Sequence, residues 1–85
     1  MKYLVEIIVQ YGEGVLNSEA RAIQNMIGTL GYEDIEEFGS GKRFTYITNK
    51  EGEESAREEA SELCEELLAF SVNEVYEIVS VEEVD

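Results

Sequence analysis

Hydrophobic and polar side chains alternate along three segments of the chain. In Lys2–Gln10 every odd position from 3 to 9 is apolar, whereas the even positions mix Leu4 and Ile8 with polar side chains. A period of two residues predicts a β-strand with one fully apolar face. The same pattern predicts strands at Lys42–Thr48 and Glu74–Val84. In the last strand, we expect one face to carry Val75, Val79 and Val81, and the other Tyr76 and Ile78.

Two further segments carry apolar side chains at helical spacing. The first helix is predicted to begin after Asn17 or Ser18 as the N-cap and to end near Leu30, with Gly31 in the left-handed conformation. Its apolar stripe consists of Ile23, Met26, Ile27 and Leu30. We expect this stripe to pack on the sheet.

The second helix is predicted to begin either at a capping box formed by Ser55 and Glu58 or at the glutamates that precede Ser55. Its apolar stripe consists of Ala56, Ala60, Leu63, Cys64, Leu67 and Leu68. Its outer face is rich in glutamate, as expected for a solvated surface. Cys64 lies on the apolar stripe, which favours a packed, unreactive thiol.

A short alternating segment, Asp34–Phe38, precedes the second strand and predicts a hairpin turning at Gly39-Ser40-Gly41. The resulting order is β-α-β-β-α-β within one α+β domain over residues 1–85. This order predicts the ferredoxin-like plan, a four-stranded antiparallel sheet with two helices on one face. The other face would be bare, and Leu4, Ile8 and Ile47 are candidates for it. We expect a domain with such a face to pair with a copy of itself.

The net charge of −14, from 20 acidic and 6 basic residues among 85, limits the partners. Such a surface repels phosphate backbones and anionic lipids, so we expect no nucleic acid or membrane partner. A single cysteine excludes an intramolecular disulfide and favours a reducing compartment. The sequence therefore predicts a cytoplasmic protein without a signal peptide.

The chain lacks the side chains of common catalytic and metal sites. It has no histidine, so a histidine-dependent nucleophile or a structural zinc site is excluded. The run Gly39-Ser40-Gly41-Lys42 is similar to the end of a phosphate-binding loop, but Glu36 stands where the first glycine is required and Arg43 where Ser or Thr is required. We therefore predict no catalytic, metal or cofactor-binding residue.

Segments along nearly the whole chain resemble the PurS family, the small subunit of phosphoribosylformylglycinamidine synthase in purine biosynthesis. They are Tyr3–Val9, Gly14–Asn17, Ala22–Gln24, Leu30–Tyr32, Gly41-Lys42, Leu63–Ala69 and Val72–Ile78. The family usually has Asp-Pro followed by Gly at the entry to the first helix, where this chain has Asn17-Ser18-Glu19-Ala20. Gly39 replaces an expected Arg, whereas Lys42 matches the family.

The resemblance implies a non-catalytic subunit of an ATP-dependent amidotransferase. In the family, the large synthetase subunit (PurL) binds formylglycinamide ribonucleotide and ATP with Mg²⁺, and a glutaminase subunit (PurQ) releases ammonia from glutamine. The small subunit forms a dimer or tetramer and helps to join the other two, without a cofactor of its own. The resemblance thus adds Gly41 and Lys42 to the interface candidates Leu4, Ile8 and Ile47.

Two other function classes fit the same element order. A regulatory domain of the ACT type would bind an amino acid at a dimer interface, using the glycine-containing loop Tyr11–Leu16. An acidic mimic of nucleic acid would instead use the glutamates of the second helix. Binding of amino acids would distinguish the first alternative from an assembly subunit.

Overall fold

The computed structural model describes residues 1–12, 15–68 and 73–84. Three strands, two α-helices and one π-helical turn follow each other in this part of the chain: β1 (Lys2–Tyr11), α1 (Ser18–Thr29), β2 (Gly41–Asn49), α2 (Glu53–Leu63), η1 (Cys64–Leu68) and β3 (Glu74–Val84). The α+β class is confirmed. The predicted connections Tyr11–Leu16 and Ala69–Ser71 lie partly or wholly outside the described residues.

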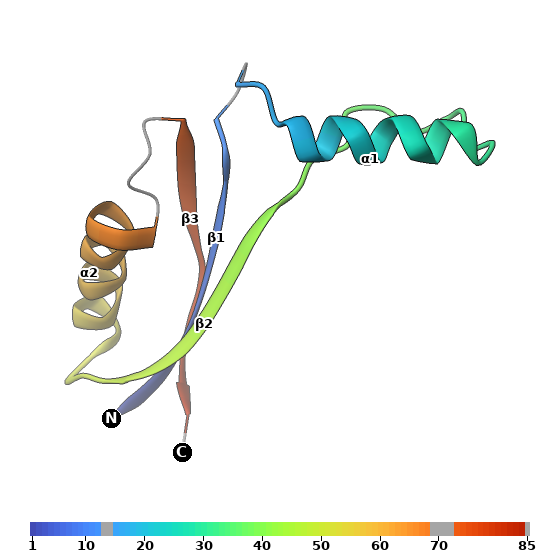
Figure 1. Cartoon of the computed structure of the whole chain (residues 1–85). Coiled ribbons are helices and arrows are strands. Elements are labelled where there is room, and N and C mark those ends of the chain that lie inside the picture. Colours follow the sequence, from blue (N-terminus) through green and yellow to red (C-terminus); the bar gives the residue numbers. More distant parts are fainter. Residues whose placement is uncertain (13–14, 69–72, 85) are drawn as a thin grey trace.

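The strands form one antiparallel sheet in the order β2-β1-β3, with β1 in the centre. The predicted alternation in β1 is confirmed, because Tyr3, Val5, Ile7 and Val9 are all buried. These side chains form the core together with α2, which covers one face of the sheet (Figure 1). The even positions of β1 therefore belong to the opposite face, which we call the open face.

Helix α2 lies close to the sheet because small side chains face the strands. Ala56, Ala60 and Cys64 are fully buried at this contact. The helix begins at Glu53 after the N-cap Gly52, which has no side chain to cap it. The capping box at Ser55 is therefore wrong, and the alternative start at the preceding glutamates is confirmed. The π-helical turn at its end changes the periodicity, which leaves Leu67 exposed rather than on the apolar stripe.

A β-bulge in β3 changes which side chains share a face. Glu6 of β1 pairs with Ser80 and Ile7 pairs with Ile78, so Val79 is an extra residue between them. As a result Val81 lies on the core side with Ile78, and the predicted grouping of Val81 with Val79 is wrong.

Helix α1 has the predicted ends. The Asn17 side chain accepts a hydrogen bond from the Ala20 backbone N–H at 3.1 Å, as an N-cap does. At the other end Gly31 has a φ of 100°, and the Tyr32 N–H donates to the Ile27 carbonyl, which is the Schellman arrangement. Both capping residues were therefore predicted correctly.

The surroundings of α1 differ from the prediction. The helix projects from one end of the sheet instead of packing beside α2 (Figure 1). Met26 and Leu30 of its stripe are 66% and 73% exposed. Residues 34–38 form no strand, so the described sheet has three strands rather than four. A strand needs a neighbour to pair with. Residues 34–38 run beside the projecting helix α1 and so lie away from the sheet edge (Figure 1).

The N-cap provides the first testable prediction. Besides capping α1, Asn17 donates from Nδ2 to the Ser40 Oγ at 3.1 Å, which links the start of α1 to the segment before β2. Replacing Asn17 with Ala should destabilise α1 by about 1 kcal/mol, giving roughly fivefold faster amide hydrogen exchange in α1. Asn17→Asp keeps the capping oxygen and should retain most of the protection. Equal exchange rates in the wild type and Asn17→Ala would contradict this role.

Candidate functional site

The three apolar interface candidates lie together on the open face. Leu4 and Ile47 are direct partners in the β1–β2 pairing, and Ile8 lies four residues further along β1, so all three point to the same side of the sheet. Ile47 is 58% exposed. Between them, Arg43 Nε donates to Glu6 Oε2 at 2.6 Å. The β1–β3 pairing places two further carboxylates on this face, Glu82 opposite Leu4 and Glu77 opposite Ile8.

Gly41 and Lys42 lie at the other end of β2, near the start of α1. Lys42 Nζ is 3.7 Å from Glu74 Oε2 of β3, and its side chain is 65% exposed. A cavity of about 200 Å³ lies beside it, with Asn17, Glu19 and Glu74 among its lining residues. Two carboxylates near one ammonium group make this cavity unsuitable for phosphate. Gly41 instead has a structural role, because a Cβ atom there would be 2.6 Å from the Val9 carbonyl oxygen.

A polar network joins the end of β2 to α2. Thr48 Oγ1 donates to Glu59 Oε1 at 2.6 Å, and Lys50 Nζ lies 2.8 Å from Glu59 Oε2. The hydrogen bonds from Lys50 and Thr48 lower the pKa of Glu59, and Glu59 raises the pKa of Lys50. The contribution of Glu59 to stability is therefore present at neutral pH and is lost as the pH falls through its lowered pKa.

The titratable side chains of the core are not arranged for catalysis. Burial, and secondarily Glu65, raise the pKa of the Cys64 thiol, which disfavours the reactive thiolate. Among residues 1–12, 15–68 and 73–84, no group of three or more Asp, Glu, Cys or His side chains could hold a metal ion. Within the same residues, no helix is both long and apolar enough to cross a bilayer.

Tyr46 carries a buried polar group that has no partner. Among the described residues, the Tyr46 hydroxyl is the buried side-chain oxygen that makes no hydrogen bond. Burial, followed by the charges of Glu59 and Cys64, raises the pKa of Tyr46. Removing the hydroxyl in Tyr46→Phe should therefore stabilise the protein by about 1 kcal/mol in denaturant unfolding. The control is Tyr3→Phe, because the Tyr3 hydroxyl donates to Met1 Sδ and its loss should bring no gain. A destabilised Tyr46→Phe would contradict the prediction.

Comparison with known proteins decides the family. The family model described as PurS, phosphoribosylformylglycinamidine (FGAM) synthase, matches residues 4–82. The chain belongs to the PurS family. It is 38% identical over 76 residues to the PurS subunit of this synthase from Methanocaldococcus jannaschii, covering 89% of this chain and 92% of the relative.

Solved PurS structures share the fold described above. The crystal structure of M. jannaschii PurS matches with a TM-score of 0.85 at 36% identity, covering 98% of this chain and 99% of that one. A chain of the PurLQS structure from Thermotoga maritima matches with a TM-score of 0.84 at 27% identity, covering 99% of both. The chain is therefore a PurS-type subunit of FGAM synthase, the enzyme of purine biosynthesis, and the resemblance found in the sequence is confirmed.

The structure also reveals surface features that the sequence did not. Two of the four stripe residues of the first helix, Met26 and Leu30, are exposed, whereas Ile23 and Ile27 are half-buried. The Asn17–Ser40 contact joins residues 23 positions apart. An amphipathic pattern indicates that a helix has a partner, but it does not say whether that partner belongs to the same chain. Neither the absence of proline nor the short polar connections indicates where α1 lies relative to the sheet.

Proposed function

We propose that this PurS chain is a non-catalytic, cytoplasmic assembly subunit of FGAM synthase. It acts as a homo-oligomer that joins a large synthetase subunit, PurL, to a glutaminase subunit, PurQ. Ammonia released from glutamine then reaches the synthetase site, where formylglycinamide ribonucleotide is converted with ATP and Mg²⁺ to formylglycinamidine ribonucleotide. The chain itself holds neither ATP nor Mg²⁺.

One observation carries this proposal: the match to a chain of the T. maritima PurLQS structure over 99% of both lengths. The surface of the chain supports it as well. The open face exposes Ile47, and α1 with its C-cap exposes Met26 and Leu30, as expected for a protein that works through contacts. Holding two catalytic centres together increases the rate through proximity and by excluding water, and it needs no reactive side chain in the connector.

The proposal is tested by mixing the purified chain with PurL and PurQ of the same organism in the presence of Mg²⁺, ATP and glutamine. Size-exclusion chromatography should give one complex that contains all three proteins. Without this chain, PurL and PurQ should elute separately. Elution of this chain alone, while PurL and PurQ form their complex without it, would contradict the proposal.

A further inference from the structure

Residues 17–40 form an arm that leaves the sheet after β1 and returns to it at β2. Helix α1 runs outward along the arm, and the following segment returns beside the helix to the start of β2 (Figure 1). At the tip, the Tyr32 N–H donates to the Ile27 carbonyl at 3.2 Å and so closes the arm. The base adjoins the last pair of the β1–β2 ladder, Gln10 with Gly41. The orientation of the arm is therefore decided at this base.

One side chain joins the two ends of the arm. Asn17 Nδ2 donates to the Ser40 Oγ at 3.1 Å and to the Ser40 carbonyl oxygen at 3.3 Å, while Asn17 Oδ1 caps α1. Ser40 directly precedes Gly41, whose backbone lies against Val9 in the ladder. We call the Asn17–Ser40 contact the clasp. It attaches the first turn of α1 to the sheet through a residue next to the ladder.

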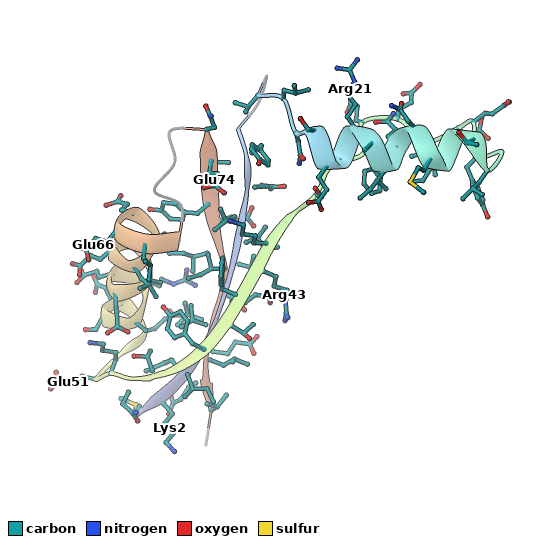
Figure 2. The ribbon with its side chains drawn as sticks, in the orientation of Figure 1. Lys2, Arg21, Arg43, Glu51, Glu66 and Glu74 are labelled. Atoms are coloured by element: carbon teal, nitrogen blue, oxygen red, sulfur yellow. The ribbon has the colours of Figure 1, made fainter. Side chains whose placement is uncertain are left out.

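Charged side chains at the base do not attach α1 to the sheet. Lys42 Nζ lies 3.7 Å from Glu74 Oε2 of β3, although Glu19 of α1 lines the same cavity. Figure 2 shows Arg21 pointing outward from the start of α1, away from β2. Within the described part of the chain, no ion pair joins α1 to a strand. The attachment therefore depends on the clasp.

The base of the arm is loosely packed. Cavities of about 200 and 520 Å³ lie there, and both are lined by Asn17 and Ser40. An added Cβ atom at Gly39 would meet open space. Close packing normally fixes one element against another, because a packed interior is not continuously deformable. The empty space at the base instead leaves room for the arm to turn.

The returning segment contains a strained residue close to the clasp. Glu37 has a φ of 52°, a left-handed conformation that residues other than glycine seldom adopt. Such a conformation persists only where the surrounding contacts enforce it. The clasp supplies a contact of this kind three residues away, at Ser40. Release of the clasp would let Glu37 relax and the arm turn.

We propose that the arm turns as one unit about its base, and that the clasp holds it in the orientation seen in the structure. Asn17 is then a positioning residue with two separable roles, because Oδ1 caps the helix and Nδ2 orients it. The far end of α1 lies roughly 16 Å from Asn17, so a turn of about 20° displaces it by about 6 Å. This device does not depend on the proposed function, since it concerns the shape of the chain by itself.

The experiment measures the distance between two spin labels, one on the arm and one on α2, by double electron–electron resonance. Gly28→Cys and Glu58→Cys provide exposed attachment points, and an added side chain at Gly28 meets open space. The native Cys64 is fully buried and should remain unlabelled. Labelled chain is diluted with an excess of unlabelled chain, so that only distances within one chain are measured. With the clasp intact, the labelled chain should give one narrow distance distribution.

Two variants release the clasp without removing the cap. Asn17→Ser keeps a capping oxygen but is too short to reach Ser40, and Ser40→Ala removes the hydroxyl acceptor. Losing a hydrogen bond of ordinary net strength should raise the population of other arm orientations about fivefold, which broadens or shifts the distribution. The control is Thr29→Ala, which removes a 3.1 Å hydrogen bond to the Asn25 carbonyl within α1 and should leave the distribution unchanged.

Amide exchange separates the orienting role of Asn17 from its capping role. In Asn17→Ser, protection within α1 should stay near that of the wild type while the distance distribution changes. Loss of protection in step with the distance change would indicate only a frayed helix and would overturn the orienting role. Unchanged distributions in both clasp variants, a clasped chain as broad as they are, or equal broadening in Thr29→Ala would also overturn the proposal.

Discussion

Replacing Ile7 with alanine should destabilise the protomer by about 2–5 kcal/mol. Ile7 is fully buried in the central strand and is among the largest fully buried side chains of the described core. Truncation removes apolar contacts and leaves a cavity between the sheet and α2. Domains of this kind unfold with a free energy of only about 5–15 kcal/mol, so the loss should lower the denaturant midpoint strongly.

Leu67→Ala is the matched control for Ile7→Ala. It removes a similar aliphatic side chain from a position that is 60% exposed, and it should cost less than about 1 kcal/mol. Both variants should be compared with the wild type at one protein concentration, because self-association contributes to the apparent stability. Equal losses of unfolding free energy in the two variants would contradict the placement of Ile7 in the core.

The second large effect is expected at Gly41, where β2 comes close to β1. A Cβ atom there would be 2.6 Å from the Val9 carbonyl oxygen and 3.1 Å from Gln10 Cβ, so Gly41→Ala must push the strands apart. We expect a loss of about 1–3 kcal/mol in urea unfolding. Gly39→Ala is the control, because its Cβ atom would meet open space and should leave stability unchanged or slightly raised. A neutral Gly41→Ala would contradict the close approach.

The parts of the fold that follow from local rules were predictable from the sequence. The alternation in Lys2–Gln10 gave the central strand and its buried face, which extends to Tyr11 in the structure. Asn17 and Gly31 gave the ends of α1, because capping depends on the side chain or backbone freedom of single residues. The boundaries of the last strand, Glu74–Val84, were also correct.

The remaining errors have non-local causes. The bulge at Val79 shifts the two-residue alternation of β3, and the π-helical turn after Leu63 shifts the helical spacing of apolar residues after α2. No particular side chain in the sequence indicates either irregularity. The short strand predicted at Asp34–Phe38 lacks a neighbouring strand to pair with in the described chain. Whether α1 packs on its own sheet depends on the path of the connecting segments, which periodicity does not encode.

The candidate site was predicted in part. The structure brings Leu4, Ile8 and Ile47 together on the open face, as the alternation of the strands required. Their role in an interface remains a prediction, as does that of Lys42. Gly41 was chosen from the family resemblance alone, and its structural role depends on the register of β1 and β2, which a single sequence does not reveal.

The most direct test of an assembly role without chemistry is the initial rate of FGAM formation by PurL and PurQ with glutamine, ATP and Mg²⁺, measured with and without this chain. The chain alone should give no turnover, and its addition should raise the glutamine-dependent rate about tenfold or more. With saturating ammonium in place of glutamine, the PurL rate should be independent of the chain. Turnover by the isolated chain, or an equal glutamine-dependent rate in its absence, would contradict the account.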